Sequence, residues 1–238
     1  MTAGWPSRAW TLDLPHGRVV AVTVAAGAAH AGAASVVEPS PDVDDLHPDE
    51  RLALAAIPPV RRPEWIAGRR ALRAALVDVG GAAAAAHPLP SDDRGAPVTP
   101  AGLVGSISHK RAVAVALAAA DEGARLGIDL EQLAPRRFDL SRRVLTAAEL
   151  EAIASLTGLA RDHAVLRAFA LKEAVYKAID PFLRRYIGFL EVAVWPSSDG
   201  TARVDSPAGS NLLVDAAWRL LDDHILCTAR ARPAPCTS

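Results

Sequence analysis

The sequence predicts a fold of the α+β class. Segments with strand signals and segments with apolar residues at helical spacing both occur along the 238 residues, but in irregular order rather than in β–α–β alternation. Half of the residues are hydrophobic and 22% are charged, which is typical of chains that fold around a buried core. At this length we expect one compact body or two closely associated lobes, with no need of disulfides.

Four segments are predicted in the first half of the chain. The β-branched residues 19–24 suit a strand, and a proline followed by two acids suits the first turn of a helix over residues 48–56. Between residues 62 and 79 apolar side chains recur at helical spacing, with arginines between them, and two glycines follow. Residues 82–100 contain four prolines and a turn sequence, so we expect a long connector.

The second half begins with a predicted β-hairpin. Its strands, residues 112–119 and 125–130, flank the turn sequence Asp-Glu-Gly at 121–123. One helix is expected to open at Thr146, and a stronger one covers residues 162–179. Three later strands are predicted to close a second lobe, at residues 188–194, 211–220 and 224–229.

Composition argues against several functional classes. A formal net charge of -1 is not that of a general nucleic-acid binder, because such proteins carry a surplus of Lys and Arg. Two cysteines, Cys227 and Cys236, cannot supply a thiolate metal cage or a disulfide framework, which favours a reducing compartment. The most apolar window, residues 19–37, is diluted by Ala and Gly, and the first residues show no export signal. We therefore expect a cytoplasmic protein without a membrane span.

Asp129 and Glu131 are the first candidates for chemistry. On a strand their carboxylates emerge on one face, with backbones about 6.6 Å apart. One interpretation is the solvated polar face of a half-buried strand. The other is a cation site, because two enclosed carboxylates repel by roughly 2 kcal/mol at an effective dielectric near 20. Mg²⁺ is the natural candidate because it prefers hard oxygen ligands and bridges carboxylates to phosphates, and Mn²⁺ suits the same ligands.

Glu173 and Lys177 lie one turn apart on the helix predicted at residues 162–179. One interpretation is a surface ion pair worth roughly 0.2–0.5 kcal/mol. The composition favours a functional role for these lysines, because Lys172 and Lys177 are two of only three lysines in a chain rich in arginine. A lysine retained in such a chain indicates a position that needs a compact ammonium rather than a planar guanidinium.

The segment SISHK at residues 106–110 places hydroxyl groups and the imidazole of His109 where a strand begins, a suitable place for an anion. A lone histidine there is more often a loop residue with a satisfied hydrogen bond. A set of arginines is equally compatible with anion binding and with solvated surface: Arg61, Arg69, Arg70, Arg73 and Arg94.

Three motifs, taken together, resemble the signature set of the 4'-phosphopantetheinyl transferases. They are GSISHK at residues 105–110, GIDLE at 127–131 and FALKEAVYKA at 169–178. The Gly-x-Pro sequence at 95–97 and the arginine-rich helix also fit, so the resemblance covers roughly residues 49–194. It resembles the large pseudo-dimeric class that activates siderophore, polyketide and nonribosomal peptide synthetases, and is similar to the enterobactin-synthetase type.

The resemblance implies two similar α+β lobes in one chain, a pseudo-dimer with coenzyme A in the cleft between the lobes. We place these lobes at residues 1–120 and 121–238. The matching positions imply that Asp129, Glu131 and Glu173 bind Mg²⁺ on the coenzyme diphosphate. Lys177 matches the lysine that contacts the diphosphate and stabilises the leaving group.

The same resemblance implies a set of residues that bind the adenosine 3'-phosphate and neighbouring groups: Arg61, with Arg62 as the alternative, Arg69, Arg94, Ser108 and His109. The implied reaction is attack by a carrier-protein serine hydroxyl on the β-phosphate, which releases adenosine 3',5'-bisphosphate. It needs in-line geometry, charge neutralisation and a proton acceptor. We expect a monomer whose partners are coenzyme A and apo acyl or peptidyl carrier proteins.

Glu149 matches the position of a proton acceptor, but Thr146 and Glu149 also form a capping box that explains the glutamate without catalysis. One position departs from the family, since Lys110 stands where relatives more often carry a small residue. Two other functions use similar residues. A metal-dependent phosphohydrolase would use the same acids with water as nucleophile, and a coenzyme A-binding module would not turn over.

Overall fold

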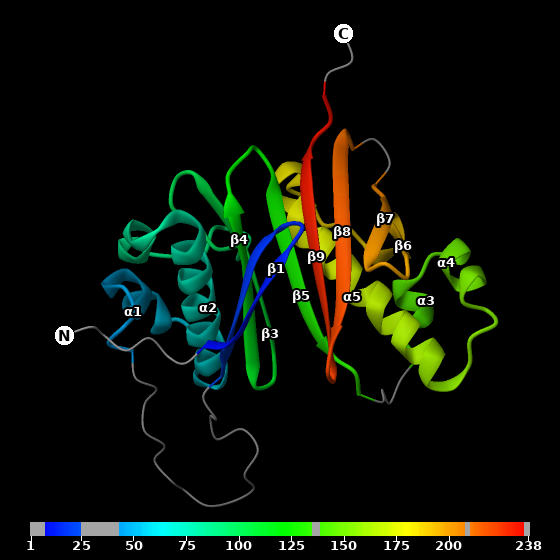
Figure 1. Ribbon diagram of the computed structural model, residues 1–238, viewed down its shortest axis with the longest axis horizontal. Helices are drawn as coiled ribbons and strands as arrows, with labels where there is room; N and C mark the ends of the chain where they lie inside the picture. Colours follow the sequence, from blue (N-terminus) through cyan, green and yellow to red (C-terminus); the bar gives the residue numbers. More distant parts are fainter. Residues whose placement is uncertain (1–7, 25–42, 135–138, 208–209, 236–238) are drawn as a thin grey trace, which may run out of the picture. The chain divides into compact units, whose positions relative to one another are not determined.

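The structure, a computed structural model, describes residues 8–24, 43–134, 139–207 and 210–235. The chain divides into two compact units, one ending at Ala120 and the other beginning at Asp121. In each unit an antiparallel sheet is covered on one face by a long helix (Figure 1). The predicted α+β class is therefore confirmed.

The first unit contains a four-stranded sheet with the strand order β1-β2-β4-β3. Its strands are β1 (Arg8–Leu14), β2 (Gly17–Thr23), β3 (Leu103–Lys110) and β4 (Val113–Ala120). Between β2 and β3 lie the helix α1 (Pro48–Leu54), the 3₁₀ helix η1 (Pro59–Arg61), the helix α2 (Arg62–Gly80) and the 3₁₀ helix η2 (Ala82–Ala86).

Helix α2 lies close to strand β3 because glycines line the contact. A Cβ on Gly68 would lie 2.9 Å from Ile107 Cγ2, and one on Gly105 would lie 2.5 Å from Leu72 Cδ1. Because side chains alternate along a strand, the odd-numbered residues of β3 all lie on the face of the sheet that α2 covers. His109 is the next position in the row, so the strand carries it toward the first turn of α2.

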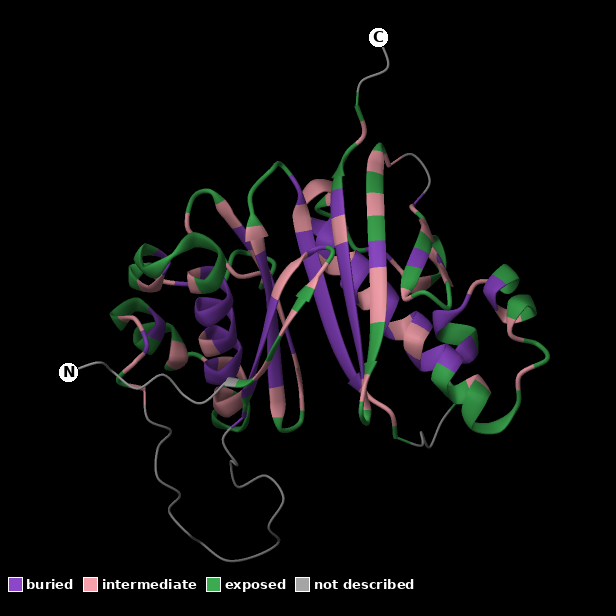
Figure 2. Ribbon diagram, in the orientation of Figure 1, coloured by how far each residue is buried: buried purple, intermediate pink, exposed green. Residues whose placement is uncertain are grey.

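The core of the first unit fills the space between α2 and the sheet. Figure 2 shows the middle of α2 as buried. The helix ends at Gly81, whose φ of 79° suits glycine and whose N–H donates to Val77 O. The largest buried side chains of this core are Val20, Val22, Leu72, Leu76 and Leu89.

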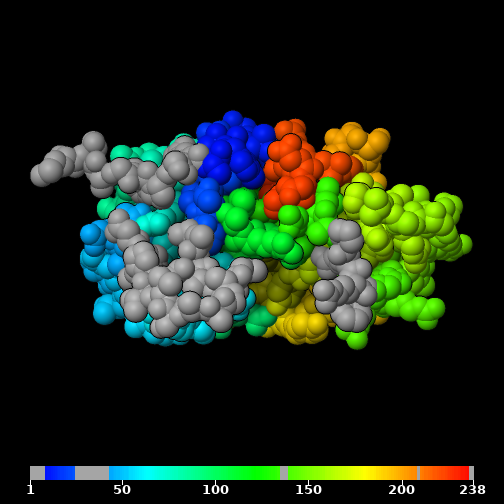
Figure 3. Space-filling view, turned by 90° about the horizontal axis from the view of Figure 1, so that it is seen from below, coloured from blue at the N-terminus to red at the C-terminus, as the bar shows by residue number. Residues whose placement is uncertain are grey.

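The second unit contains a five-stranded antiparallel sheet with the order β5-β9-β8-β7-β6. Its strands are β5 (Arg125–Gln132), β6 (Ala193–Pro196), β7 (Thr201–Asp205), β8 (Leu212–Leu221) and β9 (His224–Pro233). Its helices are α3 (Ser141–Val144), α4 (Ala147–Ala152), α5 (Gly158–Leu183) and the 3₁₀ helix η3 (Phe189–Glu191). The segment that carries α3 and α4 lies at the surface, coloured yellow-green in Figure 3.

Helix α5 touches strand β5 backbone to backbone at Gly127. A Cβ at this position would lie 1.8 Å from Ala174 O, so only glycine allows the approach. Asp129 and Glu131 follow Gly127 on the same face of the strand, because strand side chains alternate. The contact therefore carries both carboxylates beneath α5.

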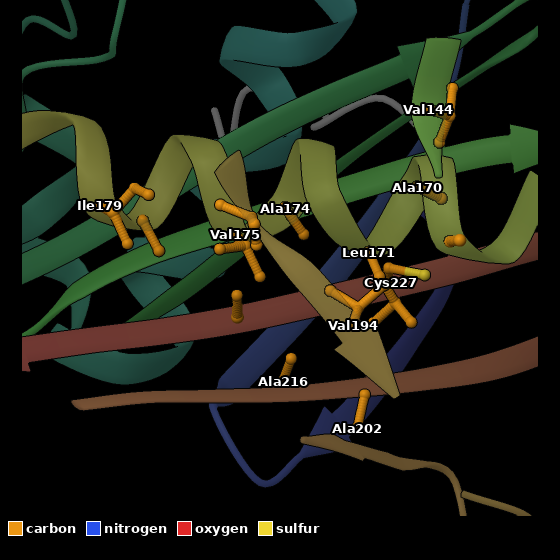
Figure 4. Packing of buried hydrophobic residues seen from close by; sticks show 14 of the residues in the cluster. Val144, Ala170, Leu171, Ala174, Val175, Ile179, Val194, Ala202, Ala216 and Cys227 are labelled. Carbon is orange, nitrogen blue, oxygen red and sulfur yellow. The ribbon is translucent and has the colours of Figure 1, made fainter. Parts of the chain in front are cut away.

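Apolar side chains complete the packing of α5 on the sheet. Leu171 and Val175 project from the helix toward Val194, Ala216 and Cys227 of three strands (Figure 4). This cluster excludes water from the sheet face that also carries the acids of β5.

Most of the predicted elements are confirmed with shifted ends. The strand at 19–24 is β2, and the helices at 48–56 and 62–79 are α1 and α2. The helix at 162–179 is the centre of the longer α5, and Thr146 caps α4 as expected. The strands at 211–220 and 224–229 are β8 and β9.

The predicted β-hairpin is wrong in its pairing. Both strands exist, as β4 and β5, but β4 pairs with β2 and β3, whereas β5 pairs with β9 in the other sheet. The turn at 121–123 does form, with Gly123 at a φ of 79°. A local turn sequence sets the turn, but strand pairing depends on distant partners that the turn does not specify.

The strand predicted at 188–194 is also partly wrong, because its first residues form η3 and β6 begins only at Ala193. The strands β1 and β7 and the helix α3 have no counterpart among the predictions. The segment SISHK belongs to strand β3 itself rather than to a segment that precedes a strand.

Cys227 is a buried free thiol, and Cys236 lies outside the described residues. Within the parts of the chain that the structure describes, no helix has the length and apolar character needed to cross a membrane.

Gly127→Ala tests the contact between α5 and β5. Because the new methyl group would overlap the backbone of α5, we expect the free energy of unfolding to fall by about 3 kcal/mol or more. Urea unfolding of the variant and the parent measures this difference. Gly188→Ala is the control, since its Cβ meets no atom closer than 3.8 Å. Equal losses in the two variants would contradict the contact.

Candidate active site

Asp129 and Glu131 are enclosed rather than solvated. Each is only 7% exposed, which excludes the interpretation as a solvated polar face. The register of the sheet places Asp129 opposite Cys227 and Glu131 opposite Ile225 on β9. The two acids therefore lie side by side on the α5 side of the strand, beside the apolar cluster.

Glu173 of α5 joins these two acids. Burial raises the pKa of Glu173, and the negative charge of Asp129 raises it further. Lys177 opposes this shift, and Glu131 adds a smaller contribution in the same direction as Asp129. Because charges act strongly only at short range in a protein, the influence of Asp129 and Glu131 on Glu173 indicates that the three predicted carboxylates lie near one another.

Lys177 reaches from α5 to β5. Its Nζ donates to Ile128 O at 2.7 Å and to Asp129 Oδ1 at 3.1 Å. This geometry differs from the surface pair within one helix that the spacing to Glu173 also allowed. The ammonium joins the helix to the strand and neutralises one of the enclosed acids.

The thiol of Cys227 borders the same group. Burial raises the pKa of this thiol well above its ordinary value, and the charge of Asp129 adds to the effect. Arg167 of α5 opposes the shift. The neighbour of Asp129 on β9 is therefore a neutral thiol.

The donors suit a hard divalent cation. The three acids offer only oxygen atoms, which Mg²⁺ and Mn²⁺ prefer. Within the described ranges, no three His, Cys, Asp or Glu side chains converge closely enough to form a metal cage by themselves. Lys177 instead occupies Oδ1 of Asp129. The acids therefore fit such a cation by the kind of donor they offer, while the ammonium of Lys177 supplies part of the neutralising charge.

Arg69 is a buried cation in the first unit. It is 5% exposed, its Nη2 donates to Ser91 Oγ at 2.8 Å, and its guanidinium lies 4.7 Å from the centroid of the Trp65 ring. Its Nε is buried and makes no hydrogen bond to any described residue. Burial lowers the pKa of Arg69 to about 10, although the charge of Glu50 opposes this. A desolvated guanidinium with a spare donor suits an anion.

His109 lies where the row of odd-numbered side chains on β3 places it. Its Nδ1 is 3.4 Å from Glu64 Oε2 in the first turn of α2. Ser108 alternates to the opposite face and is buried there. The structure therefore brings His109, but not Ser108, to the α2 side of β3.

Two further predicted arginines lie at the surface of the first unit. Arg61 is exposed at the end of η1, immediately before α2. Arg62 donates to Ile57 O at 2.9 Å, a structural contact that favours Arg61 as the binding candidate. Arg94 is exposed in a turn that the carboxylate of Asp92 stabilises.

Glu149 is buried with both oxygens engaged. Its Oε2 accepts from Thr146 N at 2.7 Å and from Lys172 Nζ at 2.6 Å, and its Oε1 accepts from Val194 N at 2.8 Å. The hydroxyl of Thr146 accepts from Glu149 N, which closes the capping box. The capping interpretation is confirmed, and these contacts favour it over a proton-acceptor role.

Lys172 has a structural position that explains why a lysine is present. Besides Glu149, its Nζ donates to Val144 O at 2.7 Å and to Phe189 O at 2.9 Å. Three acceptors match the three protons of an ammonium. Burial lowers the pKa of Lys172, and the hydrogen bond to Glu149 opposes this effect.

The sequence analysis missed the partners of the basic residues. Trp65 lies one helical turn before Arg69, so its spacing alone could have suggested the stacking. Ser91 and Glu64 reach Arg69 and His109 only through the path of the connector and the packing of α2 on β3. No spacing in the sequence encodes those contacts.

Lys172→Met should lower the free energy of unfolding by about 3–5 kcal/mol, because it leaves the buried carboxylate of Glu149 without its cation. Glu149→Gln should also destabilise the fold, since the amide cannot replace the charge. Urea unfolding measures both variants, and Arg142→Met, which removes an exposed cation from α3, is the control. Full stability of Glu149→Gln with loss of activity would instead support a purely catalytic glutamate.

Glu173→Gln should change the dependence of stability on pH. Because the pKa of Glu173 is raised in the folded state, that state binds the proton more tightly than the unfolded chain does, and stability falls as pH rises from about 4.5 through the raised value. Glutamine does not titrate. The variant should therefore gain stability relative to the parent as pH increases, measured by urea unfolding at several pH values. A constant difference would show that Glu173 is not enclosed with the other acids.

Comparison with known proteins identifies the family. Residues 49–119 match the 4'-phosphopantetheinyl transferase N-terminal domain, and residues 125–229 match the 4'-phosphopantetheinyl transferase superfamily. The 4'-phosphopantetheinyl transferase Npt of Nocardia iowensis is 32% identical over 201 residues, which cover 76% of this chain and 86% of that protein. The 4'-phosphopantetheinyl transferase PptT of Mycobacterium tuberculosis is 33% identical over 199 residues, covering 78% of this chain and 79% of that protein.

Two further matches cover less of this chain. Enterobactin synthase component D of Escherichia coli O157:H7 is 33% identical over 136 residues, covering 56% of this chain and 61% of that protein. A solved holo-(acyl-carrier-protein) synthase from Bacillus anthracis is 21% identical over 46% of this chain and 96% of its own, with a TM-score of 0.39, too low to bear on the assignment. From the two matching domains and the similarity to Npt over most of its length, the chain belongs to the 4'-phosphopantetheinyl transferase superfamily, in its large class.

Proposed function

We propose that this enzyme transfers the 4'-phosphopantetheine group of coenzyme A to a serine of an apo acyl or peptidyl carrier protein. In this reaction the serine oxygen forms a bond to the β-phosphorus, the bond from that phosphorus to the bridging oxygen breaks, and adenosine 3',5'-bisphosphate leaves. The serine proton passes to a carboxylate of the site or to water.

One observation carries the proposal beyond the family name. Asp129 and Glu131 are buried side by side and Glu173 is half-buried, and the pKa of Glu173 is raised by burial and, after that, by the charges of Asp129 and Glu131. Such a group is unfavourable unless a cation accompanies it. We assign these three acids as the ligands of a required divalent cation, Mg²⁺ or Mn²⁺. When bound, this ion would neutralise charge on the coenzyme diphosphate.

The basic residues divide between the two ends of the coenzyme in this proposal. Lys177, fixed by Ile128 O and Asp129, provides a compact positive charge for the diphosphate and the departing oxygen. Arg69 provides a buried fork with a spare donor for the 3'-phosphate. Arg61, Arg94 and His109 are assigned to the same end by resemblance.

Two predicted residues take reduced roles. Glu149 acts as a positioning residue, because it holds Lys172 and thereby the helix that carries Glu173. Ser108, on the far face of β3 from His109, can contribute only from that face. We also propose from the family resemblance that the enzyme is a cytoplasmic monomer. Its carrier would serve siderophore, polyketide or nonribosomal peptide synthesis.

An assay with coenzyme A, Mg²⁺ and an apo carrier protein tests the proposal. Intact-mass analysis should show the carrier gaining one phosphopantetheine group, and chelation of the divalent cation should stop the gain. Release of free phosphopantetheine without modification of the carrier would indicate hydrolysis instead. Thermal stabilisation by coenzyme A without any product would indicate a binding module.

Lys177→Arg should reduce turnover on the order of a hundredfold, because a wider guanidinium displaces the reacting phosphorus. The thermal midpoint should change little, since arginine can still donate to the strand. Turnover and midpoint are measured on one preparation. An unchanged rate would remove Lys177 from the reaction, and a collapsed midpoint would show that the lysine is structural.

A further inference from the structure

The connector after α2 is attached to that helix by a buried ion pair. Glu50 of α1 and Arg73 of α2 are 1% and 3% exposed, and Arg73 Nη2 donates to Glu50 Oε2 at 2.5 Å. His47 N donates to the same oxygen at 2.9 Å, so the carboxylate also caps α1. The pair joins the two helices of the first unit.

Both members of the pair also bind the backbone of the connector. Arg73 Nη1 donates to Ala85 O and to His87 O, each at 2.7 Å. Glu50 Oε1 accepts from Leu89 N at 3.0 Å. Three alternate residues of the connector are thus fixed by one buried salt bridge.

The next alternate residue of the connector meets Arg69. Ser91 Oγ accepts from Arg69 Nη2, one helical turn before Arg73 on α2. Ser91 also forms an isolated bridge with Pro97, which closes the turn that carries Arg94. The contacts from residue 85 to residue 91 therefore form one continuous attachment, and it ends at the proposed phosphate site.

We propose that Glu50 and Arg73 are positioning residues for the coenzyme 3'-phosphate: their ion pair holds the connector so that Ser91 orients Arg69 and the adjoining turn presents Arg94. This inference rests on the proposed function and adds to it a specific task for two residues that do not touch the coenzyme. A guanidinium binds a phosphate well only when its fork is correctly oriented.

Kinetics with two coenzymes test this role. Dephospho-coenzyme A lacks the 3'-phosphate, so the ratio of kcat/KM values for coenzyme A and dephospho-coenzyme A measures use of the phosphate site alone. Glu50→Gln should raise KM for coenzyme A by roughly tenfold with kcat unchanged, since this is about the effect of weakening one charged hydrogen bond to the bound coenzyme. The constants for dephospho-coenzyme A should stay as in the parent.

Two variants control for a general loss of stability. Arg73→Lys keeps the positive charge but replaces by one nitrogen the two that separately bind the carbonyls and Glu50, and it serves if Glu50→Gln does not fold. Asp45→Asn weakens a different ion pair of α2. In this pair Arg70 donates to the two carboxylate oxygens of Asp45 at 2.8 and 2.6 Å. Both of these bonds join α2 to the segment before α1. The Asp45 variant should lose stability and keep the parent's ratio.

A double-mutant cycle shows whether the pair acts through Arg69. In an Arg69→Ala background, Glu50→Gln should lower the ratio much less than it does in the parent, because only the contribution of Arg94 remains to be lost. Independent, additive losses would overturn the proposed path through Arg69. A parent-like ratio in Glu50→Gln and Arg73→Lys, despite lower stability, would show that the pair is only structural.

Failure of the underlying function gives different results. A parent that transfers nothing would refute the transferase proposal itself. A parent that transfers from both coenzymes equally would keep the transferase proposal but remove the 3'-phosphate site, and this inference with it.

Discussion

The close approach of α5 to β5 at Gly127 is the constraint on which the second unit depends. Without a side chain at that position, the helix backbone can lie directly on the strand, and the next two side chains on the same face are brought beneath it. Those side chains are acids, and helix packing deprives them of water. The glycine therefore leads to the burial of Asp129 and Glu131, which is unfavourable for charged groups. The ammonium of Lys177 compensates part of this charge, and the pKa of Glu173 is raised.

Each unit also contains the same ionic arrangement. A glutamate at the third residue of a short helix accepts from its own cap, from a buried cation on the long helix and from a distant backbone N–H. In the first unit the glutamate and cation are Glu50 and Arg73, and in the second they are Glu149 and Lys172. Buried pairs of this kind add little net stability but tolerate few geometries. They fix where the following segment of chain runs, and their recurrence supports the expectation of two similar lobes.

The sequence predicted the parts of the fold that local pattern controls. The alternation around Asp129 gave strand β5, the helical spacing around Glu173 gave α5, and Thr146 with Glu149 gave a helix cap. The sequence did not predict how the strands β4 and β5 pair, because a turn at 121–123 is compatible both with a hairpin and with a connection to another sheet. The second capping box was missed because its cap is His47, a residue type that rarely signals a helix start.

In the candidate site, too, local patterns were visible in the sequence and contacts between distant segments were not. The acids and Lys177 stood out because a single strand and a single helix carry them at regular spacing, and the family resemblance then implied their roles. The role of Lys172 was hidden, since its acceptors come from three separate segments. The environment of Arg69 was hidden for the same reason, because the irregular connector supplies Ser91.

The position of Cys227 opposite Asp129 gives the molecule an internal reporter. A thiol reacts with alkylating reagents as the thiolate, and this one is both buried and held protonated by its surroundings. Reagent can reach it only when α5 separates from the sheet. In protein whose other cysteine, Cys236, has been replaced by serine, the rate of alkylation therefore counts these openings, and it does so at the strand position that neighbours the enclosed acids.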